Sequence, residues 1–254
     1  MRPAERLRLS IVGHLVTLTL DCPAKRNALD LEAWEALGRI DEWCPAGARV
    51  LVVRGAGGTF CAGADIAEFE TVRRDAASAR SYEAANERAF DALAGLPFPT
   101  VAAIDGICFG GGFGIAAACD LRVAHPGARF AIPAARLGLA YPVGAMARLG
   151  DVIGEPMAKA MLFTARAFDQ TAMSERGFLL DVSDDAVGAA MALAGEIAAL
   201  APLTHRATKA ALAARTDADR NRAAATGDAT FESHDYAEGR AAFREKRKPV
   251  FEGR

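Results

Sequence analysis

Two glycine-rich turns contain the residues best suited to chemistry in this sequence. The first reads FCAGAD, residues 60–65, and the second reads GGGFG, residues 110–114. Each follows an apolar run and precedes helix-forming residues. The first amides of a helix lack intrahelical partners and bind anions or developing negative charge. Two such turns facing each other can supply two N–H donors to one oxygen, forming an oxyanion hole, although glycine also permits simple close packing.

Other kinds of site find little support. Gly110, Gly112 and Gly114 lack the final spacing of a dinucleotide-binding fingerprint, and neither a phosphate-binding Gly-Lys-Ser/Thr nor a Gly-x-Ser-x-Gly nucleophile turn occurs. The five cysteines form no Cys-x-x-Cys pair, and the four histidines are scattered. We therefore expect no disulfide framework, no metal and no bound cofactor.

The composition predicts a single soluble core. The chain has 254 residues, of which 52% are hydrophobic and 24% are charged. A net charge of −2 gives no electrostatic reason to expect nucleic acid or an anionic membrane as a partner. The first ten residues, MRPAERLRLS, lack the apolar core of a signal peptide, and no long apolar run predicts a membrane span. The expected location is the cytoplasm.

The elements that must position the turns alternate between strands and helices. Residues 14–21 alternate apolar and polar side chains, and residues 49–55 form a β-branched run typical of a strand buried on both faces. Residues 72–95 have the periodicity of an amphipathic helix. This order predicts an α/β core over residues 1–200 and a helical segment over residues 201–254.

Five motifs, which occur in order across nearly the whole chain, resemble those of the crotonase superfamily, the enoyl-CoA hydratase/isomerase proteins. They are KRNALD (25–30), GTFCAGADIAEF (58–69), AAIDGICFGGGFGIAAACDLRVA (102–124), ARFAIPAARLGL (128–139) and DYAEGRAAFREKRKPVFEG (235–253). The resemblance implies a spiral core of ββα turns and a C-terminal helical trimerisation segment, in a homotrimer or a dimer of trimers. It also implies an acyl-CoA substrate, with coenzyme A entering as part of the thioester.

The resemblance also implies roles for individual residues. The backbone N–H groups of Ala64 and Gly111 match the oxyanion hole that holds the thioester carbonyl as it becomes an enolate. The residues expected to bind substrate are Lys25, Arg26, Ala28, Ala62, Gly63, Ala64, Asp65, Ile66, Gly111 and Lys246. In the family, the lysine matched by Lys246 sometimes reaches coenzyme A from a neighbouring subunit. The alternative for this basic C-terminal cluster is a solvated helix end.

The two glutamates of the hydratase branch are missing. Gly114 stands where the first glutamate follows the oxyanion glycine, and Ala134 stands where the second follows the proline of IPAAR. Glycine and alanine cannot transfer protons. The sequence therefore excludes the two-glutamate hydration mechanism, and single-glutamate isomerisation at the second position fails for the same reason.

Several side chains are candidates to replace them. Tyr141 resembles a tyrosine near the substrate in the methylmalonyl-CoA decarboxylase branch, although a packing role is the alternative. Asp65 and Glu68 can supply a carboxylate, or they can simply favour the start of a helix. Arg136 can pair with a substrate carboxylate or with a surface acid, and Asp120 is expected to brace the strand that follows it.

Three functions remain open from the sequence. The first is an acyl-CoA-processing enzyme, a lyase or isomerase of the hydratase/isomerase family, whose reaction departs from simple hydration. The second is a malonyl-type acyl-CoA decarboxylase that uses Tyr141. The third is a non-catalytic acyl-CoA-binding protein. All three require the binding of a coenzyme A thioester.

Overall fold

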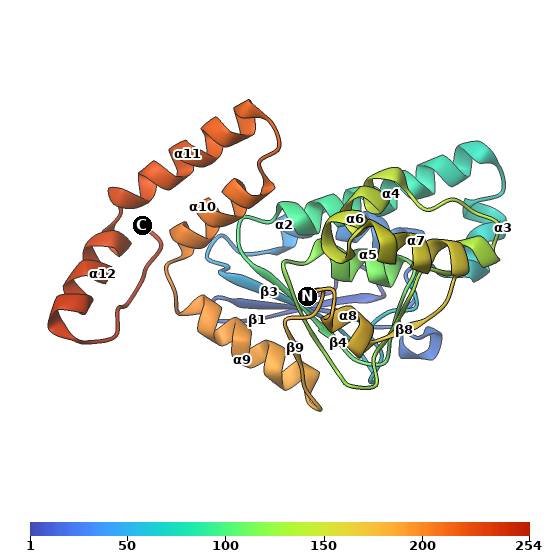
Figure 1. Ribbon diagram of the computed structural model, residues 1–254, viewed down its shortest axis with the longest axis horizontal. Coiled ribbons are helices and arrows are strands. Elements are labelled where there is room, and N and C mark those ends of the chain that lie inside the picture. Colours follow the sequence, from blue (N-terminus) through green and yellow to red (C-terminus); the bar gives the residue numbers. More distant parts are fainter.

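The computed structural model, which describes residues 1–254, contains one large and one small β-sheet (Figure 1). The large sheet has six strands in the order β1-β2-β3-β4-β6-β9, and the small sheet has the order β5-β7-β8. Strand β1 is antiparallel to β2, whereas every other pairing in the large sheet is parallel. The predicted α/β core with crossover connections is therefore confirmed.

The strands are short, and helices connect most of them. The strands are β1 (Leu7–Val12), β2 (Leu15–Leu20), β3 (Val50–Gly55), β4 (Thr100–Ile104), β5 (Ile107–Phe109), β6 (Leu121–Ala124), β7 (Arg129–Ala131), β8 (Phe168–Asp169) and β9 (Asp181–Val182). The α-helices are α1 (Leu31–Leu37), α2 (Ile40–Trp43), α3 (Phe69–Val72), α4 (Ala76–Gly95), α5 (Gly111–Ala118), α6 (Val143–Ile153), α7 (Glu155–Thr164), α8 (Gln170–Ser174), α9 (Ala186–Ala198), α10 (Pro202–Ala213), α11 (Asp217–Phe231) and α12 (His234–Glu245). Three 3-10 helices cover Pro23–Lys25, Ile66–Glu68 and Pro133–Arg136.

Strand β3 shows why the central strands are apolar throughout. Val50 and Val52 pack in a small core that includes α9, whereas Leu51 and Val53 belong to the main core on the opposite face. Because side chains alternate across a strand, a sheet with helices on both faces needs apolar residues at consecutive positions. Figure 1 shows α9 on one side of the large sheet and α4, α5 and α6 on the other.

Polar side chains fix the ends of several elements. The carboxylate of Asp30 caps α1, and Asp75 and Ser78 form a capping box at the start of α4. Asp120 accepts hydrogen bonds from the backbone N–H and the hydroxyl of Thr100 at 2.7 and 2.8 Å. We expected Asp120 to brace β6, the strand that follows it. Its carboxylate instead binds the start of β4, which is paired with β6 in the sheet.

The last three helices lie to one side of the sheets (Figure 1). An ion pair of 2.7 Å between Lys209 and Asp120 attaches α10 to the core, and Arg49 donates a hydrogen bond of 2.7 Å to the carbonyl of Phe251. None of the helices alone is both long enough and apolar enough to cross a membrane. Helices α9 and α10 together reach the required length and hydropathy, but a bend of 106° separates them.

The structure departs from the sequence prediction in three places. Strand β1, residues 7–12, was not predicted and pairs with β2 at the edge of the sheet. Residues 66–72 form one turn of 3-10 helix and one turn of α-helix in place of a longer helix. The sequence FPTVAAIDGICF predicts one strand and DLRVAHPGARFAIP predicts two short ones, but their division between the large sheet and a separate small sheet was not predicted.

Candidate functional site

The two glycine turns pack directly against each other. Cys61 and Cys108 are paired as in a parallel sheet, through hydrogen bonds from Cys61 N to Ile107 O at 3.0 Å and from Phe109 N to Cys61 O at 2.9 Å. Gly63 has a φ of +98°, and a Cβ atom at this position would lie 2.9 Å from Gly111 N. Only glycine fits here, because both the backbone conformation and the close approach exclude a side chain.

The amides of Ala64 and Gly111 are free and face the same cavity. Neither N–H donates a backbone hydrogen bond, and both residues line the cavity. Helix α5 begins at Gly111 after Gly110, which has no side chain to cap it. Because both residues are half-buried at one cavity, their two free amides are placed to donate hydrogen bonds to a ligand oxygen or to water. This is the arrangement predicted for an oxyanion hole.

Trp34 supports the second turn from behind. A Cβ atom at Gly111 would come within 2.7 Å of the buried indole ring, which itself packs edge-to-face on Phe90 with ring centroids 5.7 Å apart. The indole therefore fixes the position of the Gly111 peptide. This contact cannot be predicted from the sequence, because Trp34 and Gly111 lie in segments remote from each other along the chain.

The cavity at the turns has a volume of ≈ 80 Å³ and a mostly apolar lining. Its apolar side chains come from the segment after the first turn, from α4 and from the chain on either side of the 3-10 helix Pro133–Arg136: Ile66, Phe69, Phe90, Ile132, Leu137 and Leu139. Two polar side chains, Arg73 and Asn86, also line it. Neither residue was predicted to belong to the site, because both lie in a stretch with the pattern of an ordinary amphipathic helix.

Gly114 and Ala134 occupy different surroundings. Ala134 lines the cavity, whereas Gly114 is buried behind it. A Cβ atom at Gly114 would lie 2.7 Å from Phe90 Cε1, and still closer to Cζ of the same ring. It would also lie 2.8 Å from the hydroxyl of Tyr141. The space next to Gly114 is therefore filled by two aromatic side chains, so a glutamate there would need both to move.

Tyr141 lies in the wall of the cavity, beside the glycine turn. Its hydroxyl donates a hydrogen bond of 3.1 Å to the carbonyl of Gly110. Burial raises the pKa of this phenol above its ordinary value, which keeps the proton on the oxygen at neutral pH. Tyr141 can therefore act as a hydrogen-bond donor or acid, but not as a base.

Asp65 is held in an ion-pair network and does not face the cavity. Its carboxylate lies 2.6 Å from Lys25 Nζ and 2.8 Å from Arg6, and it also accepts from Ala67 N. Burial opposes ionisation, but the hydrogen bonds from Lys25 and Arg6 lower the pKa of Asp65. Asp65 therefore orders the first turn, and Lys25 is already paired.

The other predicted residues fall into two groups. Ala62, Ala64 and Ile66 line the cavity, as does Gly111, whereas Ala28 is buried nearby and Arg26 is exposed. Neither Glu68 nor Arg136 belongs to the lining. One carboxylate oxygen of Glu68 is enclosed without a hydrogen-bond partner, and burial together with the nearby charge of Asp30 raises the pKa of Glu68. Within one chain the structure therefore brings the turns together at a cavity that no carboxylate side chain lines.

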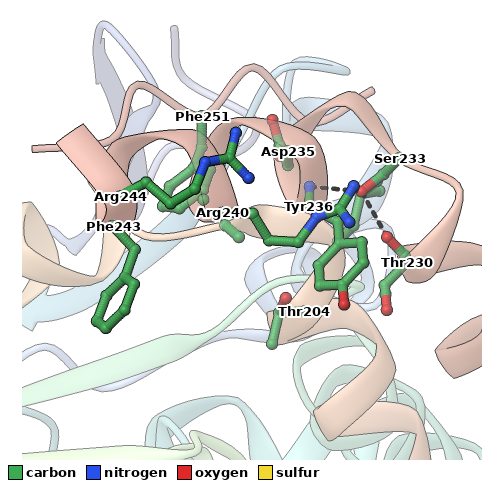
Figure 2. A pocket seen from close by; sticks show the side chains of 12 residues that line it. Thr204, Thr230, Ser233, Asp235, Tyr236, Arg240, Phe243, Arg244 and Phe251 are labelled. Atoms are coloured by element: carbon green, nitrogen blue, oxygen red, sulfur yellow. Dashed lines mark hydrogen bonds between the residues drawn. The ribbon is translucent and has the colours of Figure 1, made fainter.

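Lys246 ends α12 in a left-handed conformation and is exposed. Figure 1 places α12 and α3 at opposite ends of the molecule, so Lys246 lies far from the cavity of its own chain. A wider cavity of ≈ 580 Å³ lies between α10 and α12, with Tyr236, Arg240 and Phe243 among its lining residues (Figure 2). This cavity contains none of the predicted site residues.

The comparisons with known proteins identify the family of the chain. The family model described as enoyl-CoA hydratase/isomerase matches residues 11–254. The chain belongs to this family. It is 34% identical over 259 residues to the human enoyl-CoA hydratase domain-containing protein 2, covering 94% of this chain and 86% of that protein. It is 32% identical over 276 residues to the enoyl-CoA isomerase/hydratase fer4 of Mycosarcoma maydis, covering 100% of this chain and 97% of that protein.

A solved structure gives the same result for the fold. The enoyl-CoA hydratase/carnithine racemase of Magnetospirillum magneticum superimposes with a TM-score of 0.91 at 32% identity, covering 99% of this chain and 97% of that chain. The predicted crotonase-type α/β fold is thereby confirmed. The family assignment supports an acyl-CoA-processing enzyme of the hydratase/isomerase type.

Proposed function

We propose that this family member activates an acyl-CoA thioester through the backbone amides of Ala64 and Gly111. The observation that carries the proposal is that both N–H groups are free and line one cavity. The thioester carbonyl oxygen accepts both hydrogen bonds, and these strengthen as negative charge develops on the oxygen in the enolate. One donor of this kind typically contributes about 2.7–4 kcal/mol to transition-state stabilisation.

The reaction proposed for this site differs from two-glutamate hydration. Gly114 and Ala134 cannot move protons, and the space beside Gly114 is filled by Phe90 and Tyr141. The test is a panel of acyl-CoA thioesters screened for turnover by mass spectrometry. We expect turnover of a substrate other than crotonyl-CoA. Hydration of crotonyl-CoA at an ordinary enzymatic rate would refute the argument, and binding without any turnover would identify an acyl-CoA-binding protein.

Decarboxylation of a malonyl-type thioester is the second candidate. It needs enolate stabilisation but no strong base, and it is favoured by Tyr141, which lines the cavity and donates a hydrogen bond to the carbonyl of Gly110 in the second turn. The phenol, which keeps its proton, would protonate the enolate after carbon dioxide leaves. Release of carbon dioxide from methylmalonyl-CoA that is lost in Tyr141→Phe would support this candidate. Equal rates in both proteins would exclude a catalytic role for Tyr141.

A homotrimer, or a dimer of trimers, is the assembly that we propose for this chain. Apolar side chains are exposed on the last helices, among them Leu212, Phe231 and Phe243. Together with the cavity between α10 and α12, they offer a surface for a second copy (Figure 2). In such an assembly Lys246 would bind coenzyme A held by a neighbouring subunit, since it is remote from its own cavity.

A further inference from the structure

Arg73 places a positive charge in the wall of the apolar cavity. Its guanidinium carbon lies 4.7 Å from the ring centroid of Phe69 and 4.5 Å from that of Tyr82. The side chain is only 10% exposed, although Arg73 lines the cavity. Two aromatic rings against the guanidinium hold its plane and leave the N–H groups on its edge available for hydrogen bonds.

The charge of Arg73 is poorly compensated within the protein. Its one carboxylate neighbour is Glu83, whose Oε1 lies 3.8 Å from Nη1, too far for a hydrogen bond. The Nε–H group is enclosed and has no hydrogen-bond partner. Because a buried charge is costly unless it is paired and hydrogen-bonded, this arrangement is suited to an anion that the protein itself does not supply.

Asn86 adds a second unpaired donor to the same cavity. It follows Tyr82 by one turn of α4, is 6% exposed, and has an Nδ2 group without a hydrogen-bond partner. Buried polar side chains are nearly always hydrogen-bonded in native proteins. Arg73 and Asn86 both line this mostly apolar cavity, and each has an N–H group without an acceptor in the protein. These two donors are therefore suited to an acceptor on a bound ligand.

We propose that the acyl group of the substrate carries a carboxylate, which binds to Arg73 and accepts a hydrogen bond from Asn86. This inference rests on the proposed function, since the acyl chain must enter the cavity with its thioester at Ala64 and Gly111. Arginine pairs with carboxylates through two parallel hydrogen bonds, a geometry that the ammonium of lysine does not offer. Because such pairing stabilises the ionised carboxylate, it favours a reaction that retains this group over the decarboxylation considered as the second candidate.

The test measures binding and requires no turnover. Isothermal titration calorimetry compares glutaryl-CoA with valeryl-CoA, and succinyl-CoA with butyryl-CoA. The members of each pair have the same number of carbons and differ in the terminal carboxylate. A charge-assisted hydrogen bond corresponds to about a 10- to 100-fold difference in Kd. We therefore expect at least one carboxylated thioester to bind about 10-fold or more tightly than its neutral partner.

Variants attribute the preference to the two side chains. Arg73→Met removes the charge but keeps an unbranched side chain, and we expect it to abolish the preference while the affinity for valeryl-CoA changes less than about 3-fold. Arg74→Met is the matched control, because the neighbouring Arg74 side chain is 74% exposed and pairs only with Asp75. Asn86→Leu has a similar volume and serves as the second variant, with an expected partial loss of the preference.

The outcomes separate the two proposals. Equal binding within both pairs, or a preference that Arg73→Met leaves unchanged, would overturn the carboxylate inference while the thioester site stands. No binding by any of the four thioesters would refute the proposed acyl-CoA site itself, and the inference with it.

Discussion

Replacing Gly114 with alanine measures how firmly Phe90 and Tyr141 fill the place of the missing carboxylate. The new Cβ would lie 2.7 Å from Phe90 Cε1 and 2.8 Å from the Tyr141 hydroxyl, well inside ordinary contact distance. Overpacking of this kind costs about 1–3 kcal/mol, against a gain of about 1 kcal/mol when alanine replaces glycine in a helix. We expect Gly114→Ala to lower the free energy of unfolding by about 0–2 kcal/mol.

A matched control separates the contact from the helix propensity. A Cβ atom at Gly150, in helix α6, would meet nothing within 4 Å. Gly150→Ala should therefore raise the free energy of unfolding by about 0.5–1 kcal/mol. Both proteins are unfolded in urea at equal concentration and followed by far-UV circular dichroism.

A double-mutant cycle with Phe90→Leu identifies the cause. The smaller side chain makes room for a Cβ atom at Gly114, so we expect an interaction free energy of about 1–3 kcal/mol between the two substitutions. Additivity within about 0.5 kcal/mol would refute the reasoning. So would a Gly114→Ala protein as stable as Gly150→Ala. In either case the space beside Gly114 would be free to accept a glutamate.

Three further predictions concern the turns and the assembly. Gly63→Ala places a Cβ atom on a backbone with a φ of +98° and 2.9 Å from Gly111 N. We expect the free energy of unfolding to fall by about 1–3 kcal/mol, and calorimetry to show the loss of thioester binding. Unchanged binding would contradict the proposed oxyanion hole. Asp65→Asn should lower the free energy of unfolding by about 1.5–3 kcal/mol at pH 7, because it removes the charged partner of Lys25 and Arg6. The pKa of Asp65 in the folded protein is lowered from 3.8, so its stabilisation of the fold is present above that value and is lost as the pH falls through the folded pKa. The difference in unfolding free energy between the two proteins, measured in urea, should therefore shrink below about pH 4. A difference that stays constant with pH would argue against the ion pairs. Phe243→Asp places a charge on an 85% exposed ring, and we expect light scattering to show smaller assemblies than the wild type, whereas an unchanged mass would remove this ring from the interface.

The sequence predicted the backbone part of the site better than the side-chain part. Gly63 and Gly111 lie in turns whose glycines and flanking strands are visible in the sequence, and the structure brings these turns together. Arg73 and Asn86 could not be assigned in the same way. A charge or an amide in an amphipathic helical pattern is normally solvated, and only the folded chain shows that Phe69 and Tyr82 enclose this arginine.

Contacts between residues that are remote in the sequence could not be predicted. The contact between Trp34 and Gly111 and the filling of the space beside Gly114 depend on packing between remote residues. Residue types alone give no sign of either contact. The pairing of Asp65 with Lys25 and Arg6 was missed for the same reason, and it leaves Lys25 less free than the resemblance to the family implies.

An oxyanion hole built from peptide groups separates two tasks during evolution. Of the twenty residue types only proline would delete the N–H donor of Ala64 or Gly111. Under the proposed function, the ability to polarise a thioester therefore persists through other substitutions as long as the two turns remain packed. Proton transfer, in contrast, depends on side chains that a single codon change can add or remove. Under the proposed function, this division accounts for a chain with Gly114 and Ala134 that still binds and polarises a thioester carbonyl.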